Sequence, residues 1–373
     1  MNFSSERHEK LIEREWDPAK VMSVIESIYT DCLEQIESNS NKTIYHGSAG
    51  ALWSLLKISK FLDQAVELDA KVLIQKIYHN YLSSPDTEEV VPSLFLGEVG
   101  ILLVSYVIDP SQEIEEKIFE LVKANIENPT LEALWAAPGT MIAASWFYHK
   151  TKDESWKNLF VENATFLLGK LREEKTEDLI WQQDLYGSKI RYVGAGHGYF
   201  GNMYGILKNL ELLSADDQQY VLAHIETVLS KLAIEEEGTV NWAPLYPIHP
   251  DGKMLVQWCH GAPGIINSLK FYPKHSAKVE ELLLKGGELI WRAGPLTKGV
   301  GICHGTDGNG FALLQLYRRT GDRQWLDRAR AFAMHCLDQR KQVYELFTGD
   351  MGLALYLIAC LEESDYFPFL DDF

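Results

Sequence analysis

The stretch GVGICHGTDGNGFALL, residues 299–314, places a cysteine and a histidine side by side among glycines, directly before an apolar helical pattern. The same arrangement, Gly-x-x-Gly followed by an apolar run, occurs six times, and a seventh copy has Ala136 in place of the first glycine. Repetition of one unit along the chain is typical of a repeat architecture in which neighbouring units share a core. The second glycines of the seven copies are Gly50, Gly100, Gly139, Gly201, Gly264, Gly308 and Gly352.

Amphipathic segments alternate with these glycine-started runs. Residues 19–37 and 323–340, for example, have apolar residues at intervals of three and four and one charged face, which is typical of outer helices. The glycine-started runs are apolar on nearly all sides, as inner helices are. The sequence therefore predicts an all-α fold, an α/α toroid of seven inner and seven outer helices, in one domain over residues 1–373. Short strands are expected only within 188–195 and 238–246.

Composition and charge narrow the functional classes. The 373 residues are 46% hydrophobic and 24% charged, so the chain can bury a large core, and its net charge of -18 disfavours nucleic acid and anionic membranes as partners. The N-terminal segment is charged throughout and the apolar runs are too short to span a bilayer, so we expect a cytoplasmic protein. Five cysteines are few and odd in number, which argues against a disulfide framework.

A histidine precedes the first glycine in four of the seven units. Glycine pairs alone are explained by packing, because glycine permits a positive φ and a close approach of backbones. Histidine is a poor choice for capping a helix, so packing does not explain it. In a toroid, we expect all four to lie at the same end, where His46 has a structural role. The four are His46, His197, His260 and His304.

Two cysteines occupy the same place in neighbouring units. Cys259 and Cys303 each stand two residues before the first glycine, in WCHGAPG and ICHGTDG. Two thiols with one or two imidazoles form a ligand set for zinc, and three protein ligands leave a fourth position open for chemistry. The alternative is a pair of buried structural cysteines. The spacing leaves open whether His260 or His304 is the third ligand. The remaining cysteines, Cys32, Cys336 and Cys360, lie within helical patterns and are expected in the core.

Four motifs together resemble the lanthionine synthetase cyclases, or LanC-like proteins, over essentially the whole chain. They are YVGAGHGYFG at 192–201, WCHGAPG at 258–264, KGVGICHGTDGN at 298–309 and ELFTGDMG at 345–352. The two cysteine motifs look more like the glutathione-binding LanC-like branch than the lantibiotic cyclases. The resemblance implies an α/α toroid with one catalytic zinc ion per chain, bound by Cys259, Cys303 and His304.

The family's chemistry is the addition of a cysteine thiol to dehydroalanine or dehydrobutyrine in a peptide, which gives a thioether. The resemblance implies an enzyme of this type, with His197 as the acid or base that protonates the α-carbon. Glu132 falls where the lantibiotic cyclases have a catalytic aspartate, although a helix-capping carboxylate is an equal alternative. His260 replaces a tyrosine of those cyclases and is a further catalytic candidate.

Two basic residues are candidates for binding an anionic thiol such as glutathione. Lys298 matches a ligand-binding lysine of the glutathione-binding branch, and Arg340 is a second match with shifted spacing. A solvated loop charge is the alternative for Lys298. The expected partners are a dehydrated peptide or protein and glutathione, without nucleic acid or membrane insertion. Two other functions stay open, a glutathione-binding regulatory protein with a structural zinc and another zinc-thiolate alkylating enzyme.

Overall fold

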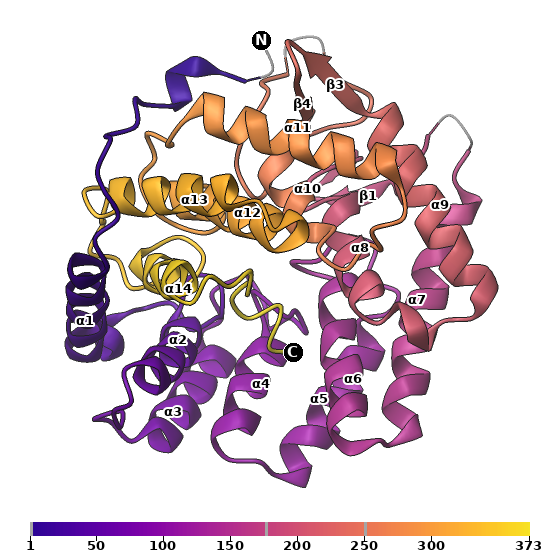
Figure 1. Cartoon of the computed structure of the whole chain (residues 1–373). Coiled ribbons are helices and arrows are strands. Elements are labelled where there is room, and N and C mark those ends of the chain that lie inside the picture. The colour runs from indigo at the N-terminus through magenta and orange to yellow at the C-terminus, as the bar shows by residue number, and fades with distance from the viewer. Residues whose placement is uncertain (1–2, 176–177, 250–251) are drawn as a thin grey trace. The chain divides into compact units, whose positions relative to one another are not determined.

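The computed structural model describes residues 3–175, 178–249 and 252–373, so residues 1–2, 176–177 and 250–251 of the predicted domain lie outside the described part. The described residues form fourteen α-helices, short 3-10 helices at Ser5–Arg7, Ile36–Ser38 and Leu210–Leu212, and four short strands (Figure 1). Among these residues, no helix has the length and apolar character needed to cross a membrane.

Seven helices begin at the repeated glycine motif, as the sequence predicts. Most of their residues are buried, including the polar side chains of Asn309 and Asp350. The first glycine of each motif, or Ala136 in the degraded copy, is the N-cap of its helix. These helices are α2 (Ser48–Phe61), α4 (Glu98–Ile108), α6 (Ala137–Thr151), α8 (Tyr199–Lys208), α10 (Ala262–Ser268), α12 (Thr306–Thr320) and α14 (Asp350–Leu361).

Seven amphipathic helices alternate with them along the chain. Several begin at an aspartate or serine whose side chain accepts a backbone N–H of the first turn, as Asp17 does from Ala19 and Lys20. The predicted alternation of two helix types is confirmed. The amphipathic helices are α1 (Pro18–Gln35), α3 (Ala70–Ser83), α5 (Gln112–Ala124), α7 (Glu154–Glu173), α9 (Ala215–Lys231), α11 (Ala277–Ala293) and α13 (Arg323–Cys336).

Two antiparallel hairpins interrupt the helices. Strands β1 (Gln183–Leu185) and β2 (Ser188–Ile190) pair across a two-residue turn, and β3 (Ala233–Glu236) pairs with β4 (Thr239–Trp242). Strands β2 and β4 lie within the two segments in which the sequence predicts short strands. Their partners β1 and β3 carry no alternating pattern long enough to predict them.

The second glycine of the motif is required by a close approach of backbone. A Cβ atom on Gly308 would lie 1.9 Å from the carbonyl oxygen of Ile302, and one on Gly264 would lie 1.8 Å from that of Trp258. No side chain can be accommodated at these distances. A positive φ is needed at only one of the first glycines, Gly261, whose φ is 104°. Close approach, rather than turn conformation, therefore explains most of the motif.

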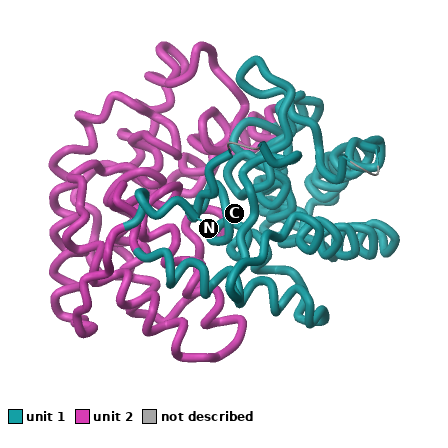
Figure 2. The backbone as a smooth tube through the Cα atoms, turned by 90° about the horizontal axis from the view of Figure 1, so that it is seen from above, with its two compact units in different colours: residues 1–8, 122–294, 373 teal, residues 9–121, 295–372 magenta. Residues whose placement is uncertain are grey.

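The chain folds into two compact units, which are described separately (Figure 2). Unit 1 contains Met1–His8, Val122–Gly294 and Phe373, and unit 2 contains Glu9–Leu121 and Pro295–Asp372. In unit 1, α6 packs on α7 and α8, α8 on α10, and α11 on α9 and α10. In unit 2, α12 packs on α13 and α14, α14 on α1 and α2, and α3 on α4. The single domain over 1–373 stays a prediction.

Candidate active site

Three of the predicted site residues lie in the turns that precede neighbouring helices of unit 1. Glu132 is in the turn before α6, His197 in the turn before α8, and His260 in the turn before α10. Because α8 packs on both α6 and α10, these turns lie next to one another. The repeated unit thus places chemically active side chains from distant parts of the sequence at one end of the same helices.

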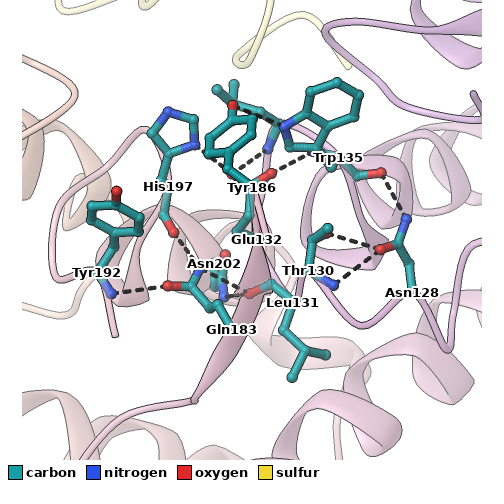
Figure 3. A network of polar contacts seen from close by, with 11 residues as sticks. Asn128, Thr130, Leu131, Glu132, Trp135, Gln183, Tyr186, Tyr192, His197 and Asn202 are labelled. Atoms are coloured by element: carbon teal, nitrogen blue, oxygen red, sulfur yellow. Dashed lines mark hydrogen bonds and ion pairs between the residues drawn. The ribbon is translucent and has the colours of Figure 1, made fainter. Parts of the chain in front are cut away.

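Glu132 and His197 form a buried hydrogen-bonded pair (Figure 3). Nδ1 of His197 lies 3.1 Å from Oε2 of Glu132. The carboxylate also accepts the backbone N–H groups of Leu134, at 3.1 Å, and Trp135, at 2.8 Å. Glu132 is fully buried, whereas 21% of the His197 side chain is exposed. Glu132 thus fixes the turn before α6 and also orients the imidazole, and its catalytic role stays a prediction.

The pair holds a proton between a buried carboxylate and a partly exposed imidazole. Burial raises the pKa of Glu132, against the opposing effect of its hydrogen bonds. Burial lowers the pKa of His197, but the hydrogen bond and the charge of Glu132 outweigh it, so the pKa of His197 is raised. Since the carboxylate accepts from Nδ1, Nε2 is the nitrogen that faces away from Glu132. Among the described residues, Nε2 has no hydrogen-bond partner.

The turn that carries His197 packs directly on the turn that carries Cys259. The backbone N–H of Gly196 donates to the carbonyl oxygen of Cys259 at 3.2 Å. A Cβ atom on Gly194 would lie 2.3 Å from that same oxygen, and one on Gly196 would lie 2.8 Å from the Cβ of Cys259. These extra glycines of YVGAGHGYFG therefore allow the two turns to touch. The Glu132–His197 pair and the first predicted zinc ligand are thereby neighbours within one unit.

Cys259 is buried with its sulfur in contact with a hydrogen-bond donor. Nε2 of Gln257 donates to the Cys259 Sγ at 2.9 Å, and Oε1 of Gln257 accepts from Arg7 at 3.2 Å. An N–H donor stabilises a thiolate better than a thiol. The next residue, His260, is half-buried, and desolvation together with the charge of His197 lowers its pKa to about 4. Its Nδ1 has no hydrogen-bond partner among the described residues.

The β1–β2 hairpin contacts the turn that carries His197. Gln183 in β1 is buried; its amide donates to the carbonyl oxygens of His197 and, at 3.4 Å, of Leu131, and it accepts the N–H of Tyr192 at 2.9 Å. The ring of Tyr192 lies 5.7 Å from that of His197 and 5.4 Å from that of His260, measured between centroids. The hairpin is therefore tied to the turn that presents the imidazole (Figure 3).

The second cysteine motif lies in unit 2, in the turn before α12. Cys303 is buried, and its backbone N–H donates to the carbonyl oxygen of Phe347 at 2.8 Å. The turn is fixed from within by Asp307, whose Oδ1 accepts the N–H of Gly301 at 2.6 Å. Lys341 donates to the carbonyl oxygens of Val300 and, at 3.3 Å, of Thr348. Backbone and side-chain contacts thus hold this loop in place.

The predicted ligand-binding cations of unit 2 differ in their surroundings. Lys298 is exposed in the loop before Cys303. The guanidinium of Arg340 is already engaged, because it donates to Asp350 at 3.2 Å, to Ser27 at 3.2 Å and to Asp31 at 3.1 Å. Lys298 is therefore the more accessible of the two for a ligand.

His46, in the turn before α2 of unit 2, contacts the turn before α14. Its Nδ1 lies 3.2 Å from Oγ1 of Thr348 and 3.5 Å from Oε2 of Glu345. These contacts connect the turn before α2 to the turn before α14, in keeping with the structural role expected for His46.

Comparisons with known proteins cover nearly the whole chain. The family model described as lanthionine synthetase C-like protein matches residues 38–371. The chain belongs to this family. The solved structure of nisin cyclase covers 91% of the chain and 94% of its own chain with a TM-score of 0.67 and 17% identity. That likeness shows the fold, and the predicted α/α toroid of seven inner and seven outer helices is confirmed.

Two curated LanC-like proteins match about half of the chain. Glutathione S-transferase LANCL1 of Danio rerio is 33% identical over 182 residues, which cover 46% of this chain and 44% of that protein. LanC-like protein GCL1 of Arabidopsis thaliana is 34% identical over 177 residues, 43% of this chain and 39% of that protein. The chain thus spans less than half the length of the curated relatives it matches.

The two predicted cysteine ligands are each suited to binding the zinc ion that is expected of a LanC-like protein. Cys259, in unit 1, and Cys303, in unit 2, are buried thiols, 7% and 5% exposed, and the Cys259 sulfur accepts an N–H from Gln257. In the part of the chain that the structure describes, however, no three His, Cys, Asp or Glu side chains form a group that could hold a metal ion. Joint coordination of one ion by these cysteines and His304 stays a prediction.

Sequence reasoning missed the aromatic and amide residues of this LanC-like site. The rings of Tyr186 and Tyr192 lie beside that of His197, and Trp135 contacts Tyr186. Gln183 and Gln257 fix the turns. None of these five stands at the repeated position that identifies the histidines and cysteines. The Tyr-Gly pair at 186–187, between two short strands, is the one local signal of the hairpin turn.

Proposed function

We propose that this LanC-like protein is a zinc-dependent enzyme that adds a cysteine thiol, from a peptide or from glutathione, to dehydroalanine or dehydrobutyrine and forms a thioether. The observation that carries the proposal is the Glu132–His197 pair, at 3.1 Å, in a turn that packs against the turn of Cys259. Thiol addition to an alkene next to a carbonyl group produces an enolate that must be protonated at its α-carbon. A positioned imidazole beside a buried thiol supplies the group for that step.

His197 acts as the general acid in this proposal. Glu132 accepts from Nδ1 and favours the imidazolium form, since it raises the pKa of His197. Nε2 then carries the proton that is delivered to the α-carbon. His260 and Tyr192 pack beside the imidazole and limit its movement. His260 is itself a further catalytic candidate, because its imidazole is neutral at pH 7.

Cys259, Cys303 and His304 would hold the zinc ion, one per chain. When bound, zinc lowers the pKa of a substrate thiol and makes it a nucleophile at neutral pH. The chain's own contribution at Cys259 is the N–H of Gln257, which favours the thiolate form of the ligand. The contact between Gly196 and Cys259 then keeps His197 beside the ligand.

An apolar cleft beside Tyr192 suits the peptide that carries the unsaturated residue. The cleft has a volume of about 240 Å³ and is lined by apolar residues together with two polar ones: Tyr192, Ala243, Pro244, Leu245, Ile248, Gly252 and Leu255, with His249 and Lys253. Tyr192 faces both this cleft and His197, so a peptide side chain in the cleft would bring the neighbouring residue to the imidazole. A site of this kind favours an apolar peptide segment without a positive charge, because Lys253 also lines it.

Glutathione is the free thiol that the chain supports best. The name of the Danio rerio relative, a glutathione S-transferase, supports this choice. Lys298 is exposed and would attract the carboxylates of glutathione, whereas Arg340 would first have to release Asp31 or Asp350. Because glutathione is abundant in reducing compartments, this proposal agrees with the predicted cytoplasmic location.

Mass spectrometry tests the proposal. The zinc-loaded protein is incubated with a peptide that contains dehydroalanine, with and without glutathione, and with a second peptide that also contains cysteine. An adduct that contains glutathione identifies intermolecular addition, whereas cyclisation leaves the mass unchanged and removes the free thiol. No acceleration over the uncatalysed rate with either peptide would favour a glutathione-binding regulatory protein with a structural zinc.

A further inference from the structure

The tip of the β1–β2 hairpin carries a tyrosine, Tyr186, whose backbone φ is positive, a conformation that tyrosine rarely adopts. Tyr186 and Gly187 form the two-residue turn, with φ of 53° and 73°. A positive φ at the first turn position is accommodated best by asparagine, aspartate or glycine, and for a bulky residue it costs about 1–2 kcal/mol. Tyr186 is also 68% exposed, so packing in a core does not offset this cost. The side chain itself must account for a tyrosine at this position.

The Tyr186 side chain is held against the acid–base pair (Figure 3). Nε1 of Trp135 donates to the Tyr186 hydroxyl oxygen at 3.2 Å. The Tyr186 ring also meets the His197 ring edge to face, with centroids 6.0 Å apart and an angle of 79° between the planes. Since the backbone N–H of Trp135 donates to Glu132, one residue fixes both the carboxylate and the tyrosine. Tyr186 is thus positioned relative to His197 although its ring is exposed.

The hydroxyl group of Tyr186 keeps a hydrogen to donate. Its oxygen accepts the indole N–H, and no acceptor for its own hydrogen exists among the described residues. Desolvation and the nearby Glu132 charge raise the pKa of Tyr186 against the opposing hydrogen bond from Trp135, so the phenol remains protonated at neutral pH. An oriented, protonated phenol beside a general acid is a donor for an oxygen on which negative charge develops.

We propose that Tyr186 donates a hydrogen bond to the carbonyl oxygen of the dehydroamino acid while His197 protonates its α-carbon. This inference rests on the proposed thiol addition. The sulfur forms a bond to the β-carbon, and the π electrons move through the α-carbon to the carbonyl oxygen, where Tyr186 stabilises the enolate without losing its proton. The enolate electron pair then takes the proton of His197 Nε2 and the carbonyl group re-forms. The proton of the thiol leaves to solvent, which later reprotonates the imidazole.

Tyr186→Phe tests this role, because it keeps the ring and the turn and removes only the hydroxyl group. Loss of a single donor to a developing oxyanion reduces kcat by about 10²–10³-fold in buried sites. For this partly exposed residue we expect a fall in kcat of about 10- to 100-fold with a KM change of less than about threefold. Tyr220→Phe on α9, whose ring packs on Arg172, is the matched control and should retain the wild-type rate.

A graded replacement separates hydrogen bonding from packing. Fluorinated tyrosines introduced at position 186 make the phenol more acidic with little change in size, so kcat should rise with acidity as long as the phenol stays protonated. A rate within about twofold of wild type for Tyr186→Phe, or no trend across the fluorinated series, would overturn the inference. An inactive wild-type protein would instead refute the thiol addition itself, so the two failures are distinguishable.

Discussion

Replacement of Glu132 by glutamine changes the acid–base pair with little change in volume. The carboxylate accepts three N–H groups, from His197, Leu134 and Trp135, at 3.1, 3.1 and 2.8 Å. Glutamine has one acceptor oxygen and one donor group, so in either orientation of the amide at least one of these N–H groups faces another N–H. The variant therefore loses both a charge and a buried hydrogen bond.

The Glu132 substitution should affect stability and rate by different amounts. A buried donor left without an acceptor costs about 1–3 kcal/mol, which sets the expected loss in the free energy of unfolding. General acid catalysis contributes about 10²–10⁴-fold in rate, and the imidazole of His197 remains in the variant. We therefore expect kcat to fall by about 10- to 100-fold, or about 1.4–2.7 kcal/mol in activation free energy.

The loss of rate in the Glu132→Gln variant should also depend on pH, in a direction that the structure predicts. Glu132 raises the pKa of His197, so the acid form of the imidazole persists to higher pH in the wild type. Without the carboxylate that pKa falls, and the loss of rate should be larger at pH 8 than at pH 6. The charged and titratable groups that also face His197 are Tyr186, Tyr192, His260 and Cys259, and they are unchanged in the variant.

The assay is the rate of thioether formation at both pH values, with thermal unfolding measured in parallel. Glu98→Gln is the matched control, because Glu98 is also a buried glutamate close to the start of a helix of the repeat and accepts from Tyr78 at 2.8 Å. The control should lose stability without losing rate per folded molecule. A Glu132→Gln protein with the wild-type rate at pH 6 and pH 8 would refute the role of the pair.

Three further predictions concern zinc, glutathione and a buried aspartate. The purified protein should contain close to one zinc per chain, and metal analysis should show that Cys303→Ala loses it while Cys336→Ala, a buried cysteine on α13, retains it; equal zinc in both variants would contradict the ligand assignment. Lys298→Glu should weaken calorimetric binding of glutathione by about fivefold, or ~1 kcal/mol, and binding of an uncharged cysteine derivative much less; equal losses would exclude a charge contact. Burial raises the pKa of Asp307 to about 7, so the folded state binds the proton more tightly than the unfolded chain and stability should fall as pH rises from about 4 to 7. Asp307→Asn should abolish most of this decline, at most about 3 kcal/mol between pH 5 and pH 8, in denaturant unfolding at those two pH values; an unchanged decline would show that other groups cause it.

The helical fold was predictable because its signal is repeated. Six of the seven units show a glycine where a Cβ atom would meet a carbonyl oxygen, as at Gly308, and an apolar run follows it. The alternation of such runs with amphipathic helices then specifies the order of the elements. The short strands β1 and β3 were not predictable, since three or four residues carry too little alternation to distinguish a strand from a loop.

The site was predictable only where its residues share a repeated position. His197, Cys259 and Cys303 precede a motif glycine, so the repeat identifies them. Glu132 lies in the degraded unit, and its contact with His197 spans 65 residues, a pairing that only the packing of α6 on α8 brings about. Tyr186 lies on a hairpin outside the repeat, so no spacing rule connects it to the histidine.

The stereochemistry of proton delivery in D₂O tests the central claim most directly. If His197 protonates the α-carbon from one side, the wild-type product of thiol addition should carry one deuterium at that carbon as a single stereoisomer. His197→Ala should form product slowly and as a mixture of the two stereoisomers, because solvent then protonates either face. A stereoisomer mixture from the wild-type protein, or an unchanged rate and single isomer from His197→Ala, would contradict the account.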